Sequence, residues 1–236
     1  MSHWPIERVD KIDSTQDELK RRASSGQALP AIFMARHQTK GRGRFDRTWE
    51  SIESQSLTVS LALPEWRNHP APWLPGMMTA CAAAAAFSIR VQWPNDLTIQ
   101  KKKTGGILVE RITLADGSSQ PIVGMGINLT NTEFSDSIAH RATSLLLGRS
   151  VTLTPDEALE KVLARLQPLA LIKTWHELLP YWSLLDDTPG KIYTLPTGEE
   201  ATALGLGSEG QLICSVDGEA RSVVAAEALF GTGDSG

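Results

Sequence analysis

The sequence predicts an α+β domain followed by a small all-β domain. Segments with helical spacing alternate with segments of strand-like patterning as far as residue 185, whereas short strands separated by glycine turns follow from residue 186. A chain of 236 residues is long enough for one medium domain and a smaller companion. We therefore expect two domains, 1–185 and 186–236.

The first domain opens with a short helix, expected over residues 15–25. Ser14 and Asp17 are typical of a helix start, because a hydroxyl and a carboxylate there accept hydrogen bonds from unpaired backbone N–H groups, and Gly26 is a typical stop. Strict alternation of leucine and valine predicts a strand over 57–63 with one buried face. Further strands are expected over 31–36, 97–100, 106–112 and 121–128, with a core helix over 73–88 and a lysine-rich turn over 101–105.

A later helix is marked by its opening, Thr154, Pro155 and Glu157, and apolar side chains recur at helical spacing as far as Leu166. We expect this helix to pack on the sheet. The pattern after residue 186 is typical of a small β-barrel. Its strands are expected over 191–195, 201–206, 211–216 and 220–225.

Composition and charge exclude several classes of protein. A net charge of -4 argues against a general nucleic-acid binder, which usually carries a basic excess over a whole domain. The amino terminus lacks the apolar run of a secretory signal, and no apolar segment approaches the ~20 residues of a membrane span, so we expect a cytoplasmic protein without membrane contact. Cys81 and Cys214 are far apart and are expected to be reduced core residues.

The segment from Gly41 to Trp49 combines two glycines with three arginines. Glycines let backbone amides approach an anion, and arginine donates two hydrogen bonds to a phosphate or a carboxylate. Such a loop suits a charged, phosphate-bearing ligand. Taken alone, it equally fits a solvated basic loop or an RNA-contacting segment in which Trp49 stacks on a base. Its glycine spacing matches neither the P-loop nor the dinucleotide-binding fingerprint.

A second cluster is Trp93-Pro94-Asn95-Asp96, with Lys103 seven residues later. Because the proline interrupts any helix, Asn95 and Asp96 are expected in a turn, where short polar side chains can face a ligand or a metal ion. Lys103 would lie across the hairpin as a compact charge suited to an anion. An ordinary solvated turn is the alternative. A third segment, 124–129, is expected to be a buried strand whose glycines permit close approach of a ligand ring.

In this order and at these separations, the segments resemble the catalytic domain of biotin protein ligases over nearly the whole chain. The family's motifs correspond here to Ser14-Thr15-Gln16, Gly41 to Trp49, Gln92 to Asp96, Lys103 with Gly106-Ile107-Leu108, and Gly124 to Asn128. Two positions depart from the family pattern. Gln16 stands where asparagine is usual, and Gln92 replaces the lysine that normally precedes the tryptophan.

The resemblance implies a mixed or antiparallel sheet with packed helices and an SH3-like carboxy-terminal barrel. It also implies roles for individual residues. Biotin would be bound by Ser14, Thr15, Gln16, Gln38, Gly41, Arg42, Gly43, Arg44, Lys103 and Gly106. ATP and the adenylate would be bound by Arg42, Arg44, Trp49, Asn95, Asp96 and Asn128. Lys103 and Arg42 would be catalytic, and Asp96 would help to place Mg²⁺.

The activity implied is a two-step ligation, in which biotin is activated by ATP as biotinyl-5′-adenylate and passed to a lysine of a biotin carboxyl carrier protein. Cations fit this chemistry, because it brings a carboxylate to a phosphate and the two anions repel each other. The alternatives are a lipoate or octanoate ligase or transferase and a non-catalytic nucleic-acid-binding regulator. Fewer than fifteen residues precede Ser14, so we expect a short form without a helix-turn-helix domain and without sequence-specific DNA binding. The acceptor, and the choice between monomer and homodimer, stay open.

Overall fold

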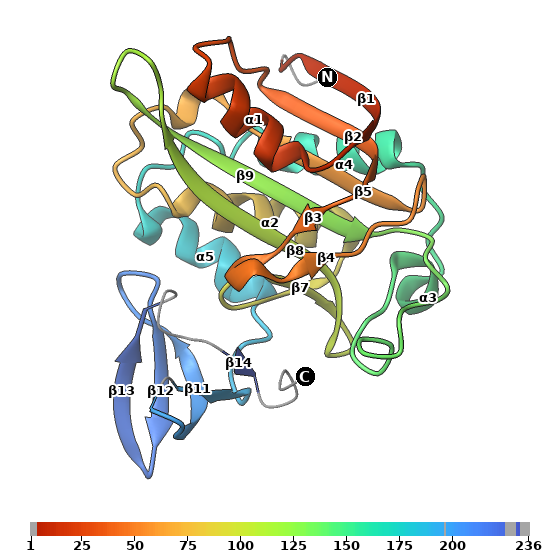
Figure 1. Cartoon of the computed structure of the whole chain (residues 1–236). Coiled ribbons are helices and arrows are strands. Elements are labelled where there is room, and N and C mark those ends of the chain that lie inside the picture. Colours follow the sequence, from red (N-terminus) through yellow and green to blue (C-terminus); the bar gives the residue numbers. More distant parts are fainter. Residues whose placement is uncertain (1–3, 196, 225–229, 232–236) are drawn as a thin grey trace.

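The computed structural model of the chain describes residues 4–195, 197–224 and 230–231. Its larger part is built on one seven-stranded sheet with the strand order β1-β2-β5-β9-β8-β7-β6 (Figure 1). Only β1 and β2 are parallel neighbours, so the sheet is mixed. The strands are β1 (Ile6–Ile12), β2 (Ile32–Gln38), β5 (Ser56–Leu61), β6 (Arg90–Gln92), β7 (Asp96–Ile99), β8 (Lys102–Thr113) and β9 (Ser119–Asn128).

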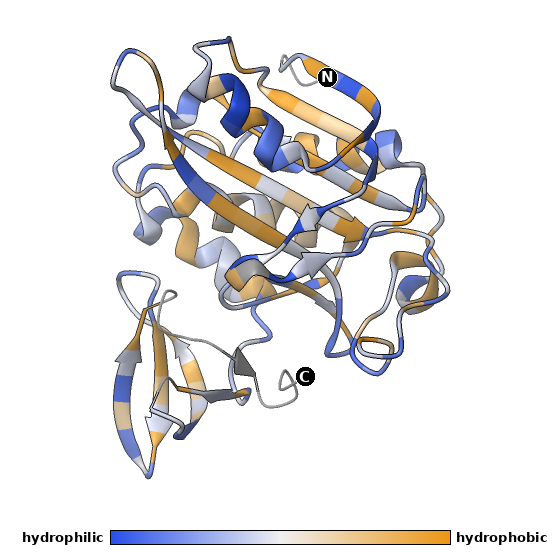
Figure 2. Ribbon diagram, viewed as in Figure 1, coloured by the Kyte–Doolittle hydropathy of each residue, from blue (hydrophilic) through white to orange (hydrophobic). Residues whose placement is uncertain are grey.

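Helices cover both faces of this sheet. Helix α1 (Thr15–Ser24) lies on one face, where Leu19 packs on Phe33 and Ile122. The other face is covered by α2 (Leu74–Phe87) and α4 (Pro155–Leu166), and α5 (Trp175–Leu185) packs against α2. A short helix, α3 (Leu145–Arg149), follows β9. Figure 2 shows that α1 exposes a hydrophilic surface, whereas β2 and β9 are mainly hydrophobic.

Helix α2 confirms the core helix expected over 73–88. Almost all of its side chains are buried, because it lies between the sheet and two other helices. Small side chains allow this close packing: a Cβ added at Gly76 would lie 2.2 Å from Cγ2 of Val109. No helix within the described ranges has the length and apolarity needed to cross a membrane.

The carboxy-terminal strands form a separate antiparallel sheet, as expected. They are β10 (Ile192–Thr194), β11 (Glu200–Leu206), β12 (Leu212–Val216), β13 (Glu219–Val223) and β14 (Phe230–Gly231), in the order β13-β12-β11-β10-β14. Residue 225, the end of the last predicted strand, lies outside the described residues. No ladder between described residues joins β13 to β14, so closure into an SH3-like barrel stays a prediction. Helix α5 ends at Leu185, so we propose that the boundary between the two domains lies between residues 185 and 186.

The turn predicted over 101–105 is shorter and earlier than expected. Gln100 and Lys101 both have positive φ, at 49° and 67°, which is the geometry of a two-residue hairpin turn. Lys103 therefore belongs to strand β8 instead of to a solvated turn. Similarly, Asn95 lies in a turn as predicted, but Asp96 is the first residue of β7.

Both cysteines are free and buried, which confirms that they are unpaired core residues. Burial raises the pKa of the Cys81 thiol to about 12, so this thiol stays protonated at neutral pH.

Candidate active site

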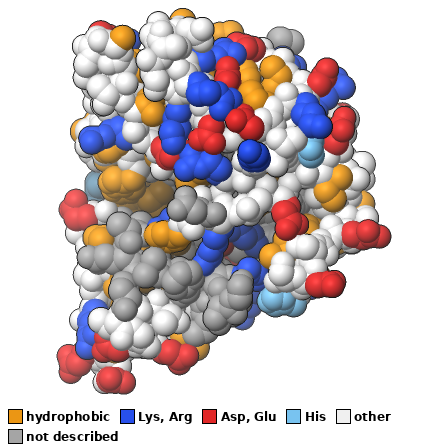
Figure 3. All heavy atoms as spheres, viewed as in Figure 1, with side chains coloured by type: hydrophobic (Ala, Val, Ile, Leu, Met, Phe, Trp, Pro, Cys, Tyr) orange, Lys and Arg blue, Asp and Glu red, His pale blue; other side chains and the backbone are white. Residues whose placement is uncertain are grey.

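One cavity of about 950 Å³ opens above the middle of the large sheet. It is bounded by the start of α1, the residues after Gly41, strands β5, β8 and β9, and the turn before β7, and residues 190–193 of the smaller sheet line one side. Figure 3 shows lysine and arginine side chains gathered in a hollow near the middle of this face.

Nearly all the predicted site residues line this cavity. They are Ser14, Thr15, Gln16, Gln38, Arg42, Gly43, Arg44, Trp49, Asn95, Asp96, Lys103, Gly106 and Asn128. Gly41 is the exception. It pairs with Trp49 between β3 (Gly41–Arg42) and β4 (Thr48–Trp49), and a Cβ at Gly41 would lie 2.4 Å from the Trp49 carbonyl oxygen. The lack of a side chain at Gly41 therefore allows the two strands of this hairpin to lie close together.

One end of the cavity is a buried cluster of polar side chains. The backbone N–H and the hydroxyl of Thr15 donate to Oε1 of Gln38, at 2.7 and 3.0 Å. The Ser60 hydroxyl lies 2.9 Å from that of Thr15 and donates to Oε1 of Gln16 at 3.0 Å, and Nε2 of Gln16 donates to the Ile122 carbonyl at 3.2 Å. These contacts fix the side chains in one arrangement. Ser60 was missed by the sequence reasoning, because its strand was assigned only one buried face.

Two glycines of β9 form the floor beside this cluster. A Cβ at Gly124 would lie 2.9 Å from Oε1 of Gln16, and a Cβ at Gly126 would lie 2.4 Å from Cε2 of Trp49. Bare backbone at these positions lets the amide and the indole lie directly on the strand. The Trp49 indole therefore lies on β9 and lines the cavity.

The hairpin that begins at Gly41 is tied to the sheet through Arg42. Its Nη1 donates to Oδ1 of Asp17 at 2.7 Å and lies 3.2 Å from Oε2 of Glu110, and Nζ of Lys20 lies 2.9 Å from Oε1 of the same glutamate. Burial acts to raise the pKa of Glu110, but the Lys20 hydrogen bond and the Arg42 charge outweigh it, and the pKa is lowered. Arg42 thus lines the cavity while two carboxylates hold its guanidinium, and neither carboxylate was predicted from the sequence.

We expect Glu110→Gln to loosen this hairpin, because the amide no longer attracts Arg42 as a charge. The Arg42–Glu110 ion pair is partly exposed, so its loss should cost ~0.2–1 kcal/mol. Trypsin should therefore cleave after the hairpin arginines up to about fivefold faster. Limited proteolysis of the folded protein measures this. Glu18→Gln is the control, because Glu18 pairs with Arg21 and Arg22 of its own helix. Equal cleavage of both variants would contradict the prediction.

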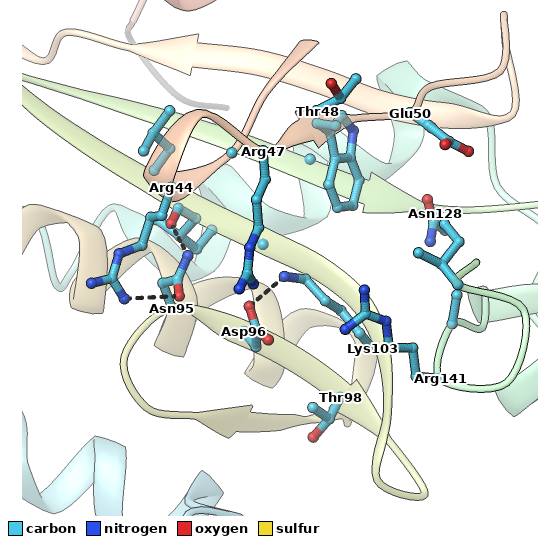
Figure 4. A pocket seen from close by; sticks show the side chains of 18 of the residues that line it. Arg44, Arg47, Thr48, Glu50, Asn95, Asp96, Thr98, Lys103, Asn128 and Arg141 are labelled. Carbon is cyan, nitrogen blue, oxygen red and sulfur yellow. Dashed lines mark hydrogen bonds and ion pairs between the residues drawn. The ribbon is translucent and has the colours of Figure 1, made fainter. Parts of the chain in front are cut away.

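The other end of the cavity gathers charged side chains. Nζ of Lys103 lies 2.6 Å from Oδ1 of Asp96, and Nη1 of Arg44 donates to Oδ1 of Asn95 at 3.5 Å (Figure 4). Arg47 and Arg141 point into the same region. Arg47 belongs to the arginine-rich segment that was expected to bind an anion, whereas Arg141 was not predicted. Burial lowers the pKa of Arg44, partly offset by the nearby Asp96. A group of cations around one carboxylate suits a polyanionic ligand.

Backbone contacts position this charged end. Lys103 lies opposite Thr98 in the β7–β8 ladder, whose register shifts between Leu97 and Thr98. The Lys103 N–H donates to the Arg141 carbonyl at 2.7 Å. Nearby, Nδ2 of Asn128 donates to the Thr143 carbonyl at 3.0 Å. The segment after β9 therefore forms the wall next to Lys103.

A polar end and a cationic end in one cavity define a ligand-binding cleft on the large sheet of an α+β fold. The sequence profile of the Biotin/lipoate A/B protein ligase family matches residues 9–128, just over half of the chain, and the chain belongs to this family.

Within the family, the chain is similar to biotin protein ligases. It is 27% identical over 222 residues to the bifunctional ligase/repressor BirA of Escherichia coli, covering 88% of this chain and 68% of the relative. The BirA of Bacillus spizizenii is 35% identical over 144 residues, or 58% of this chain, and the match spans 44% of that relative's length. The structure of biotin protein ligase from Aquifex aeolicus in complex with biotin and ATP has a TM-score of 0.75 and 27% identity, covering 94% of this chain and 96% of that one.

Proposed function

We propose that this protein activates biotin with ATP as biotinyl-5′-adenylate and transfers the biotinyl group to a lysine of a biotin carboxyl carrier protein. The observation that carries the proposal is one cavity that has a fixed polar cluster at one end and cations at the other. Biotin has the same two ends, a polar ureido ring and a carboxylate. The Aquifex aeolicus relative, solved with biotin and ATP, supports this pairing.

The polar cluster favours biotin over lipoate or octanoate. Four side-chain oxygens, on Thr15, Gln16, Gln38 and Ser60, meet there, together with the N–H donors of the two glutamine amides. This mixture of acceptors and donors suits the N–H groups and the carbonyl oxygen of a ureido ring. An apolar tail would desolvate these oxygens without offering a hydrogen bond, which is unfavourable.

In the first step, a carboxylate oxygen of biotin attacks the α-phosphorus of ATP, the bond to the β-phosphate bridge breaks, and pyrophosphate leaves. Lys103 and Arg44, which lie together at the cationic end, would offset the negative charge that collects on the α-phosphoryl oxygens. Lys103 can exchange its contact with Asp96 for one with the ligand, because the pair is partly exposed. In the second step, the acceptor lysine amine attacks the acyl carbon of the adenylate, and AMP leaves.

The ligand assignments stay those implied by the family. Ser14, Thr15, Gln16, Gln38 and Gly106 would surround the ureido ring, and Arg42, Gly43 and Arg44 the valerate and the phosphate. Asn95, Asp96 and Asn128 would hold the nucleotide. The Trp49 indole lies on Gly126 of β9 and would border the adenine of the nucleotide.

Magnesium fits this site through Asp96. The described residues contain no group of three or more metal-ligating side chains, but Mg²⁺ bound with a nucleotide usually takes only one or two carboxylates, with phosphate oxygens and water completing its shell. Asp96 supplies one carboxylate beside the cations. The ion would add positive charge at the phosphates.

The test is pyrophosphate exchange into ATP, measured separately with biotin, lipoate and octanoate. We expect exchange that depends on biotin, with little exchange on the other two acids. Transfer is then followed with a purified biotin carboxyl carrier protein, with the same protein lacking its target lysine as the control. Exchange with lipoate or octanoate but without biotin would overturn the proposal in favour of the related ligases.

A further inference from the structure

Trp93 directly precedes the turn at the cationic end, and all three of its hydrogen-bonding groups are bound by the carboxy-terminal part of the chain. Its backbone N–H donates to the Thr188 hydroxyl at 2.9 Å. Its carbonyl accepts from the Tyr193 hydroxyl at 2.7 Å. Its indole N–H donates to the Gly210 carbonyl at 3.1 Å. We call these three contacts the Trp93 clamp.

The clamp is buried and closely packed. Trp93 is 2% exposed, Tyr193 4% and Thr188 0%. The rings of Trp93 and Tyr193 meet edge to face, with centroids 6.0 Å apart. Gly210 has a φ of +76°, and a Cβ there would lie 2.7 Å from the ring of Trp73. Because the clamp excludes water, losing one of its hydrogen bonds would leave a buried polar group without a partner.

The turn that follows Trp93 is held from two sides. Pro94 comes next, and then Asn95 and Asp96, which line the cavity. The Asn95 carbonyl accepts from the Ile107 N–H at 2.8 Å, and Nδ2 of Asn95 donates to the Ile107 carbonyl at 2.9 Å. Strand β8 therefore fixes one end of the turn and the clamp fixes the other. Asp96, whose carboxylate contacts Lys103, directly follows this turn.

The polar end has no such dependence. Thr15, Gln16, Gln38 and Ser60 all belong to the large sheet and α1, and their contacts described above are with residues of the first 185. The carboxy-terminal sheet reaches the cavity only through residues 190–193 among those described, and Tyr193 is one of them.

From this division we infer that Thr188 and Tyr193 are positioning residues, which hold the turn before β7 at the ATP end of the cleft through the Trp93 clamp. The inference rests on the proposed function for the identity of the two ligands. Weakening the clamp changes ATP binding and the rate of adenylate formation, and it leaves biotin binding unchanged.

The chain offers a matched pair for the test, because it contains two tyrosines. Tyr193→Phe removes the hydroxyl that binds the Trp93 carbonyl, whereas Tyr181→Phe alters a half-exposed tyrosine of α5. Calorimetry of the folded proteins measures Kd for biotin and for ATP with Mg²⁺. For Tyr193→Phe we expect ATP to bind about tenfold more weakly, as for one lost buried hydrogen bond, with biotin within about twofold of the parent. Tyr181→Phe should match the parent for both ligands.

Thr188 gives a second, independent arm. Thr188→Val removes the acceptor of the Trp93 N–H at nearly constant volume, and Thr188→Ser keeps it. We expect Thr188→Val to raise KM for ATP and to lower kcat, with KM for biotin unchanged. Thr188→Ser should match the parent in KM for ATP and in kcat. Hydrogen exchange of the Trp93 amide, faster in Thr188→Val than in Thr188→Ser, reports on the clamp without any activity.

The outcomes separate the two proposals. Equal weakening of biotin and ATP in Tyr193→Phe and Thr188→Val, or no change in either, would overturn the positioning role. A different result would contradict only the proposed function. In that case the parent would show no biotin-dependent pyrophosphate exchange, while hydrogen exchange of the Trp93 amide would still be faster in Thr188→Val than in Thr188→Ser. The clamp would then stand as a structural contact.

Discussion

Replacement of Lys103 by alanine is expected to reduce biotin-dependent pyrophosphate exchange by about 100-fold to 1000-fold, the usual effect of removing one group that stabilises transition-state charge. Lys103 is placed at the cationic end, with its ammonium 2.6 Å from the Asp96 carboxylate. Its side chain is 41% exposed, so its pair with Asp96 contributes little to folding. The loss should therefore appear in kcat, with the thermal unfolding midpoint close to that of the parent.

Lys102→Ala is the control for this variant. Lys102 is the neighbouring residue of β8, it is exposed, and successive side chains of a strand point to opposite faces. It does not line the cavity. Near-normal exchange by Lys103→Ala would show that this lysine is only a paired strand residue, and the assignment of the cationic end would then be wrong.

The second large effect is expected for Gly126→Ala. The added Cβ would lie 2.4 Å from the Trp49 indole, so the ring must leave its place on β9 and move into the cavity. Overpacking of this kind costs about 1–3 kcal/mol, which corresponds to roughly fivefold to 150-fold weaker ligand binding if the ring occupies the ligand's place. Calorimetric titration with biotin measures the change.

A double-mutant cycle separates this clash from damage to the strand itself. In a Trp49→Leu background the indole is gone, so adding Gly126→Ala should weaken biotin binding far less than it does in the parent. The difference between the two effects measures the contact between Trp49 and residue 126. Additive effects would mean that the alanine disturbs β9 directly. The contact with Trp49 would then not be the reason why position 126 requires glycine.

The elements predicted well are those with a strong local pattern. Helix α2 and helix α4 are long apolar or amphipathic segments with clear boundaries, and the leucine alternation marked β5. Strand β1 was missed because its apolar residues Ile6, Val9 and Ile12 recur every third residue, as an exposed edge strand tolerates. Helix α5 was missed although Thr174 and Glu177 form a capping box, because Pro180 interrupts its pattern.

The arrangement of the site was less accessible to sequence reasoning. The sequence motifs of the site were recognised because they combine glycine with charged residues in short segments. Glu110 and Ser60, which contact Arg42 and Gln16, lie in ordinary strands whose local sequence gives no such signal. Only the order of strands in the sheet brings Ser60 to the cavity and Glu110 into contact with Arg42. The turn at Gln100 and Lys101 was also hidden, because neither residue is typical of positions with positive φ.

The Trp93 clamp also orders events during synthesis of the protein. The last of its three partners, Gly210, lies 117 residues after Trp93, so a ribosome working at about 5–20 residues per second makes it about 6 to 23 seconds later. All four side chains of the polar cluster have left the ribosome before then. On the proposed function, a chain that stops before Gly210 would contain all four residues of the polar cluster but would lack one contact of the Trp93 clamp at the ATP end.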